Sequence, residues 1–255
     1  LTLIVAYSRP LFSGKSLVAS DFGVSSVVLE KSSFPSFIGG GWQPLEMGRA
    51  SPPLSPTPTR LLLLKLLSPD TYRHAAFMLN TFLLFLAAVY LLRGKGLLWT
   101  SCLIGGLAMA FSGQSFSIIS AGHLGKFGMM PCAVLMLGLL DRAISRRSVL
   151  HYSLAGCVAA MGMFEQPDVM LLFYALGACY AFYKIWLERP AEGKVISLAK
   201  HSAGVLLAAV VFVAVALPTL MSTLGGRVEE RGEVIKGSGM TPYDYSTCWS
   251  MPPEE

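Results

Sequence analysis

The chain has 255 residues, of which 53% are hydrophobic and only 14% are charged. Its mean hydropathy is +0.57, which excludes an ordinary water-soluble domain, because too few polar side chains are available to cover the surface. The formal net charge of +5 does not indicate a nucleic-acid partner, since the basic residues are divided among separate loops and form no single patch with interleaved aromatic residues. We therefore expect a chain whose main surroundings are the lipid bilayer.

The apolar runs have the length of helices, which favours transmembrane helices over a barrel of alternating strands. We predict an all-α, polytopic bundle with about six full spans after a truncated first helix at residues 1–7. The chain starts without methionine and stops after a polar stretch, so we expect a fragment of a longer protein. The predicted spans are 72–92, 97–120, 127–140, 149–164, 169–187 and 195–220.

Basic residues gather in the short loops that strict alternation of these helices places on one side. The positive-inside rule makes that side cytoplasmic. The opposite side then receives a long loop at 8–71, the turns near 113–126 and 165–168, and the stretch 221–255, which we interpret as the start of a further part of the protein. Within the long loop, the short apolar run 61–67 predicts an interfacial helix in which Lys65 extends toward the water.

Asp21 lies early in the long loop, shortly after the first helix leaves the membrane. A carboxylate at this place can act as a general base on an acceptor hydroxyl, or it can hold a divalent cation on a phosphate. The alternative is an aspartate that caps a helix or a turn. The residue pattern alone favours this simpler alternative.

The stretch from Ser120 to Lys126 joins two predicted helices on the same outer side and contains Gly122, His123 and Gly125. The glycines allow close approach of the backbone, and His123 and Lys126 can donate to a phosphate oxygen as it becomes a leaving group. A tight helix–helix turn with exposed polar groups is the alternative. Gln114 and the neighbouring serines are candidates for a polar cavity on this side.

Glu165 and Asp168 form a further outer turn with two carboxylates three residues apart. Paired acids suit a general-base or metal-binding role. An acid near the start of a helix also stabilises the helix dipole, and this is the role that we expect for Asp168. Glu165 is therefore the better functional candidate of the two.

The last stretch of the chain contains Tyr243, Asp244, Tyr245 and Trp249. Aromatic side chains beside a carboxylate often bind sugar rings, which makes Trp249 a candidate substrate-binding residue. Tyrosine and tryptophan are also ordinary anchors at a membrane interface, and that alternative stays open.

The order of these features resembles the GT-C superfamily of membrane glycosyltransferases, in which a helix and a long external loop with an early acid precede many short-looped helices. Three motifs are more narrowly similar to bacterial YfhO-family membrane proteins. They are Phe12-Ser13-Gly14-Lys15 with Ser20-Asp21, the turn Ala121-Gly122-His123-Leu124-Gly125-Lys126, and Trp249-Ser250-Met251-Pro252-Pro253-Glu254-Glu255.

The resemblance implies transfer of a sugar from a polyprenyl-phosphate donor to an acceptor on the outer side of a bacterial cytoplasmic membrane. It assigns the base or metal-binding role to Asp21, contacts with the lipid phosphate to His123 and Lys126, and a second acid to Glu165. The first loop contains no Asp-x-Asp or Glu-x-Asp pair, so a need for Mg²⁺ or Mn²⁺ stays open. The alternative functions are a transporter or lipid flippase and a non-catalytic assembly subunit.

Overall fold

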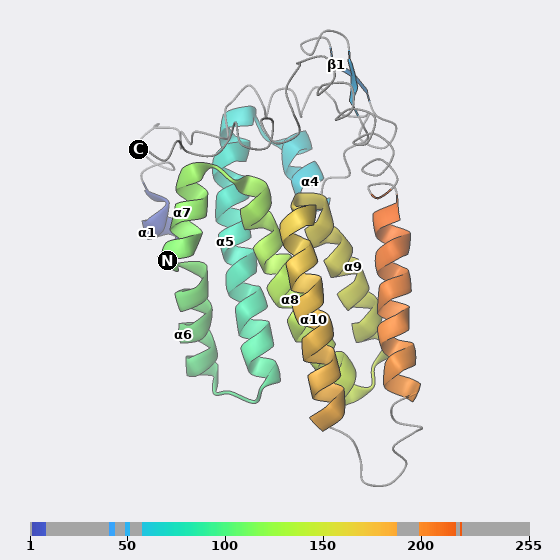
Figure 1. Ribbon diagram of the computed structural model, residues 1–255. Coiled ribbons are helices and arrows are strands. Elements are labelled where there is room, and N and C mark those ends of the chain that lie inside the picture. The colour runs from blue at the N-terminus through green and yellow to red at the C-terminus, as the bar shows by residue number, and fades with distance from the viewer. Residues whose placement is uncertain are drawn as a thin grey trace, which may run out of the picture.

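The computed structural model describes residues 2–8, 41–43, 49–51, 58–187, 199–217 and 220. Within these ranges the fold is helical except for β1 (Gly41–Gln43) and β2 (Arg49–Ser51), which pair antiparallel. The helices (Figure 1) are α1 (Thr2–Ala6), α4 (Pro58–Leu66), α5 (Pro69–Gly94), α6 (Trp99–Ala110), α7 (Gly113–Ala121), α8 (Leu124–Arg146), α9 (Val149–Glu165), α10 (Pro167–Leu187) and a last, unlabelled helix at Ala199–Leu217. The helical bundle expected from the sequence is thus present.

Five helical stretches in the described part of the chain are long and apolar enough to cross a membrane. The α9 helix is also apolar, but its 17 residues make it shorter than these five. At about 1.5 Å per residue it measures about 25 Å, slightly less than a typical hydrocarbon core of about 30 Å. The five stretches are His74–Gly94, Trp99–Ala121, Leu124–Arg146, Pro167–Leu187 and Ala199–Leu217.

Two predicted boundaries differ from the structure for clear physical reasons. The predicted helix 97–120 is divided between α6 and α7, because the Ser112 side chain accepts a hydrogen bond from the Ser115 amide and caps a new helix. The predicted helix 127–140 is instead the 23-residue α8, because the helix continues through charged residues at both ends. The interfacial helix predicted at 61–67 corresponds to α4.

The α8 helix is the centre of the bundle, with α5, α9 and α10 packed around it (Figure 1). In its most apolar stretch 72% of the residues are buried, against 17% for both α10 and the last helix. Phe77 on α5 and Phe127 on α8 form part of the core, with ring centroids 6.2 Å apart. The outer helices expose large side chains such as Leu172, Phe182 and Leu206, which suits contact with lipid.

The long helices alternate in direction (Figure 1), as the sequence predicts. One end of the bundle carries α4, the turn between α7 and α8, and the turn between α9 and α10; we call it the α4 end. The other end holds the two connections after α5 and after α8, and we call it the basic end. Its cationic side chains are Arg93, Lys95, Arg142, Arg146, Arg147, Lys184 and Lys200.

Candidate functional site

The turn between α7 and α8 is short because Gly122 adopts a left-handed conformation with φ of 83°. This conformation is easy for glycine and lets its amide close the last turn of α7 on Ile118 and Ile119. His123 follows as the N-cap residue of α8, and its carbonyl accepts a hydrogen bond from the Phe127 amide at 3.0 Å. The turn places His123 and Lys126 at the α4 end, where both are half-buried.

The start of α8 lies directly against the end of α9. A Cβ atom added to Gly125 would lie 2.6 Å from the Glu165 carbonyl oxygen, and one added to Gly128 would lie 2.9 Å from Glu165 Oε2. The two glycines are three residues apart and therefore lie on the same face of α8. Because neither has a side chain, the end of α9 can pack directly against this face. The structure thus brings together two outer turns that the sequence identifies separately: the one with His123 and Lys126, and the one with Glu165.

Glu165 also lines a small recess between α4, α5 and α8. Its other lining residues include Tyr72 and Asn80, together with apolar side chains such as Leu63 and Leu124. The volume of the recess is ≈ 10 Å³, which is about enough for one water molecule. This recess is too small for a sugar ring.

Asp168 lies in the first turn of α10, as expected of an acid that stabilises the start of a helix. Its Oδ1 atom accepts a hydrogen bond of 2.7 Å from the Gln166 side chain. Gln114 is exposed on α7, while its neighbour Ser115 is buried and donates to the Met109 carbonyl oxygen. Asp21 and Trp249, the other two candidates, lie outside the described residues.

The side-chain clusters that commonly hold a divalent cation contain several carboxylate, histidine or cysteine groups. In the described ranges, no group of three histidine, cysteine, aspartate or glutamate side chains comes together. The expected acid of the first loop, Asp21, is outside these ranges. A need for Mg²⁺ or Mn²⁺ therefore stays open.

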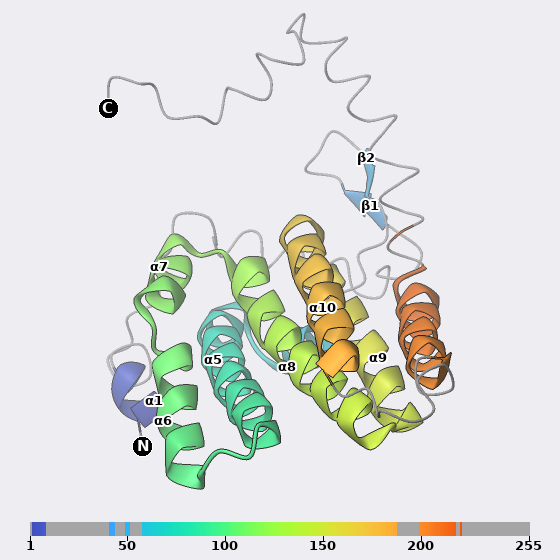
Figure 2. The same cartoon turned by 60° about the horizontal axis from the view of Figure 1, so that its bottom comes forward.

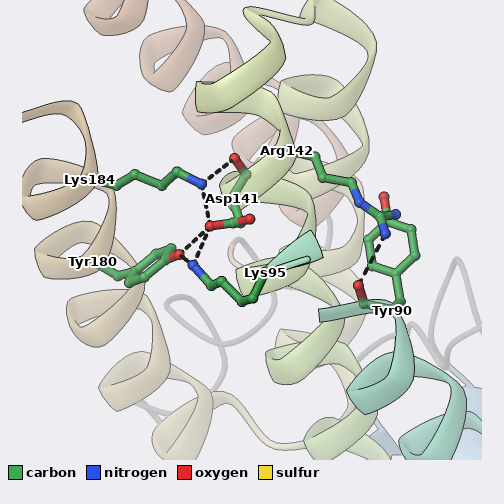
Figure 3. A network of polar contacts seen from close by, with 6 residues as sticks. All are labelled: Tyr90, Lys95, Asp141, Arg142, Tyr180 and Lys184. Carbon is green, nitrogen blue, oxygen red and sulfur yellow. Dashed lines mark hydrogen bonds and ion pairs between the residues drawn. The ribbon is translucent and has the colours of Figure 1, made fainter. Parts of the chain in front are cut away.

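A second polar site, at the basic end, is centred on Asp141 of α8 (Figure 3). The Asp141 side chain is only 2% exposed. Its Oδ1 atom accepts hydrogen bonds from Lys95 at 2.5 Å, from Lys184, and from the Tyr180 hydroxyl. Lys184 also donates to the Asp141 carbonyl oxygen at 2.9 Å. One carboxylate thus joins the connection after α5 to α8 and α10.

The two lysines differ in their exposure to solvent. The Lys184 side chain is 12% exposed, whereas that of Lys95 is 42% exposed. Partial burial alone would lower the pKa of the Lys95 ammonium, but its hydrogen bonds to Asp141 and Tyr180 outweigh that effect and raise the pKa. Lys95 therefore stays charged throughout the physiological pH range.

Arg142 extends the polar site toward α5. Its guanidinium carbon lies 3.4 Å from the centroid of the Tyr90 ring, and its Nη2 atom donates to the Tyr90 carbonyl oxygen at 3.1 Å. Stacking and hydrogen bonding to the same residue hold the Arg142 side chain against Tyr90, pointing away from the Asp141 carboxylate (Figure 3). Together the contacts of Asp141 and Arg142 join α5 and its following connection to α8 and α10 at the basic end.

The sequence interpretation used Lys95, Arg142 and Lys184 only to orient the helices, and it did not identify Asp141 or Tyr180. The sequence feature that could have identified Asp141 is an ionisable residue within an apolar helix. Placing such a residue in a membrane costs free energy, so it is normally paired with another polar group. Asp141 is the single acid in α8. It lies five residues before the end of the helix, which corresponds to about 7 Å.

Comparisons with known proteins identify no relative. No family model, no curated protein and no solved structure matches this chain.

Proposed function

We propose that the chain is a multi-pass membrane protein whose basic end faces the cytoplasm and whose α4 end faces outward. The support is the distribution of charge: apart from Lys126 beside the turn between α7 and α8, the described cations next to the short connections lie at one end of alternating apolar helices, as the positive-inside rule predicts. The resemblance to bacterial YfhO-family proteins implies that this membrane is the cytoplasmic membrane of a bacterium.

At the α4 end we propose transfer of a sugar from a polyprenyl-phosphate donor, by a GT-C-like protein related to the YfhO family. The observation that carries this proposal is the close packing of the first turn of α8 on the end of α9 at Gly125 and Gly128. It brings a histidine, a lysine and a carboxylate to one region of one end of the bundle. A phosphate-linked substrate requires cationic groups of this kind near a general base.

In the proposed reaction the acceptor hydroxyl oxygen attacks the anomeric carbon of the sugar. The bond from that carbon to the phosphate oxygen breaks, and polyprenyl phosphate leaves with the bonding electron pair. A carboxylate, Asp21 or Glu165, takes the hydroxyl proton, while His123 and Lys126 stabilise the charge that develops on the phosphate. Gln114 and Trp249 are assigned to binding the sugar or the lipid, and Mg²⁺ or Mn²⁺ to the phosphate if a metal takes part.

Transport or lipid flipping is the second candidate function, and one observation favours it. Asp141 is a buried ionisable group inside a helix that is apolar enough to span a membrane, and such groups often lie on substrate pathways. Its hydrogen bonds to Lys95, Tyr180 and Lys184 already explain why a buried aspartate can be present there. We therefore rank transport below sugar transfer.

Binding of the lipid phosphate provides a direct test of the site at the α4 end. Protein in detergent micelles is irradiated with a photoactivatable polyprenyl phosphate, and labelling is compared between wild type and His123→Gln and Lys126→Gln variants. Lys65→Gln is the matched control, because Lys65 is an exposed lysine of α4 at the same end of the bundle.

We expect the two site variants to lose most of the labelling and the control to retain it. Equal labelling of all four proteins contradicts the assigned phosphate site. If folded wild type is not labelled, the proposal that this end of the bundle binds a lipid phosphate is wrong. A role in assembly with other proteins then becomes the better explanation of the polar turns at the α4 end.

A further inference from the structure

Two exposed tryptophans lie at the basic end of the bundle. Trp99 is the first residue of α6 and is 59% exposed. Trp186 is the second-last residue of α10 and is 56% exposed. A tryptophan combines a large apolar ring with an N–H donor, which suits surroundings that are apolar on one side and polar on the other.

The two tryptophans lie on different sides of the bundle. The α6 helix packs against α5, whereas α10 packs against α8 and α9. Figure 2 shows α5 and α8 between α6 and α10. A single protein partner would have to extend around the bundle to cover both rings. A membrane interface surrounds the bundle at one level and contacts all of its sides, so it is the simpler partner.

Contacts between polar side chains place the two tryptophans near one level of the bundle. Lys95 lies in the short connection that precedes Trp99, and it contacts the Asp141 carboxylate. The same carboxylate contacts Lys184, which lies two residues before Trp186, or about 3 Å along the helix. Both tryptophans are therefore near the level of one polar cluster that crosses the bundle.

Exposed cations accompany the aromatic rings at this level. The guanidinium carbon of Arg93 lies 4.9 Å from the centroid of the Trp99 ring, and its Nη1 atom donates to the Leu97 carbonyl oxygen at 2.7 Å. Arg93 and Lys95 are both exposed, and Tyr183 on α10 is 59% exposed. Such a surface complements lipid: the rings suit the apolar side of the interface, and the cations suit the phosphates.

We propose that Trp99, Tyr183 and Trp186 form an aromatic belt that binds the interface of the cytoplasmic leaflet, with lipid phosphates next to the exposed cations of the same level. The inference rests on the membrane placement proposed above and adds a depth to it. It places the inner boundary of the hydrocarbon at the basic ends of α6 and α10, as aromatic belts do in membrane proteins. It is independent of sugar transfer at the α4 end.

This depth determines the levels of two other residues. Leu176 is exposed on α10 ten residues before Trp186, which corresponds to about 15 Å. That length is half of a hydrocarbon core about 30 Å thick, so Leu176 lies near the middle of the bilayer. Asp141, which contacts Lys184 close to Trp186, lies near the boundary instead. A charged side chain costs less free energy there than at the centre of the hydrocarbon.

Quenching of tryptophan fluorescence by brominated lipids measures the depth of each ring. The chain has four tryptophans, so replacing three of them with phenylalanine gives one protein that retains only Trp99 and another that retains only Trp186. The matched control has all four replaced by phenylalanine and carries Leu176→Trp. Each protein is reconstituted in phosphatidylcholine–phosphatidylglycerol vesicles with bromine atoms either near the head group or near the ends of the acyl chains. Circular dichroism checks that each protein stays helical.

We expect the shallow bromine atoms to quench Trp99 and Trp186 more strongly than the deep ones do, and the Leu176→Trp control to show the reverse. The depths of Trp186 and the control should differ by about 11–15 Å, the span of ten residues in a helix tilted by up to about 40°. The depths of Trp99 and Trp186 should agree within about 5 Å, the rise of one helical turn.

Two results would overturn the aromatic belt while leaving the membrane placement intact. In the first, deep bromine atoms quench Trp99 or Trp186 as strongly as they quench the Leu176→Trp control, which places that ring inside the hydrocarbon. In the second, the control is quenched but one or both tryptophans are not quenched by any lipid, which identifies a protein surface as the partner. If no lipid quenches the folded control, α10 does not face lipid, and the proposed membrane placement is wrong as well.

Discussion

Asp141 on α8 and Lys184 on α10 are joined twice, because the Lys184 ammonium donates both to the Asp141 carboxylate and, at 2.9 Å, to its main-chain carbonyl oxygen. The two side chains are 2% and 12% exposed. Such a contact fixes the spacing of α8 and α10 at the basic end. Lys95 and Tyr180 share the same carboxylate oxygen, so one acid holds together three segments that are far apart in the sequence.

Asp141→Asn should destabilise the bundle by about 3 kcal/mol, since it leaves two ammonium groups close together without their shared negative charge. The measurement is the free energy of unfolding in detergent micelles, followed by circular dichroism. Asp168→Asn is the control: Asp168 is an exposed acid at the α4 end, and its replacement should change stability by less than about 0.5 kcal/mol. Equal, small effects of both substitutions would show that the Asp141 contacts do not stabilise the fold.

Lys95 gives the stability of the bundle a defined pH dependence. Its pKa in the folded protein is raised above the ordinary value of 10.5, so the stabilising contribution is complete below about pH 10 and is lost as pH rises through the raised pKa. The melting temperatures of wild type and Lys95→Gln should therefore differ by a constant amount between about pH 7 and about pH 9 and converge only at higher pH. A difference that changes between neutral pH and about pH 9 contradicts the raised pKa.

Gly125 and Gly128 should respond differently to substitution by alanine. At Gly125 the new Cβ meets the backbone oxygen of Glu165, whereas at Gly128 it meets the movable end of the Glu165 side chain. Gly125→Ala should cost about 1–3 kcal/mol through forced separation of α8 and α9, and Gly128→Ala should cost less.

A second substitution distinguishes the two contacts. Glu165→Ala removes the atoms that meet the new Cβ of Gly128→Ala, so it should restore that variant to the stability of Glu165→Ala alone. It leaves the backbone oxygen in place and should not restore Gly125→Ala. Rescue of both variants, or of neither, in thermal unfolding would show that the end of α9 does not rest on these glycines as described.

Arg147→Gly should raise the free energy of unfolding by about 1 kcal/mol, because glycine adopts a left-handed conformation without the Cβ penalty. The native φ at this position is 51°. Chemical unfolding in micelles measures the gain. A loss of stability would mean that contacts of the Arg147 side chain, rather than its backbone, determine the energetics of this helix end.

The sequence predicts most of the bundle because hydrophobic runs of span length are a strong local signal. The start of α9 at residue 149 and the end of α10 at residue 187 agree with the predicted ranges. The predicted range 127–140 is shorter than α8 (Leu124–Arg146), because the uninterrupted apolar run lies between Lys126 and Asp141. In the structure Asp141 is buried and paired, and its partners come from residues about 45 positions away on either side, which no local pattern can reveal.

The candidate site at the α4 end could be predicted only in part. Glycines beside polar residues at 122–126 and the acid at 165 identified two turns, and the structure places these turns in contact through Gly125 and Gly128. Their contact depends on how α8 packs on α9, which hydropathy does not determine. Asp21 and Trp249 lie outside the described residues, so their roles remain predictions.

Sugar transfer itself is the most direct test of the proposed function. The full-length protein is reconstituted in liposomes with labelled polyprenyl-phosphate sugars and an acceptor fraction from the cell envelope, and wild type is compared with Asp21→Asn, Glu165→Gln and the control Asp168→Asn. We predict transfer by wild type and the control, and a loss of at least about 100-fold in at least one of the other two variants, the size expected for a missing general base. Absence of transfer by folded wild type with every donor, or full activity of both Asp21→Asn and Glu165→Gln, would contradict the account.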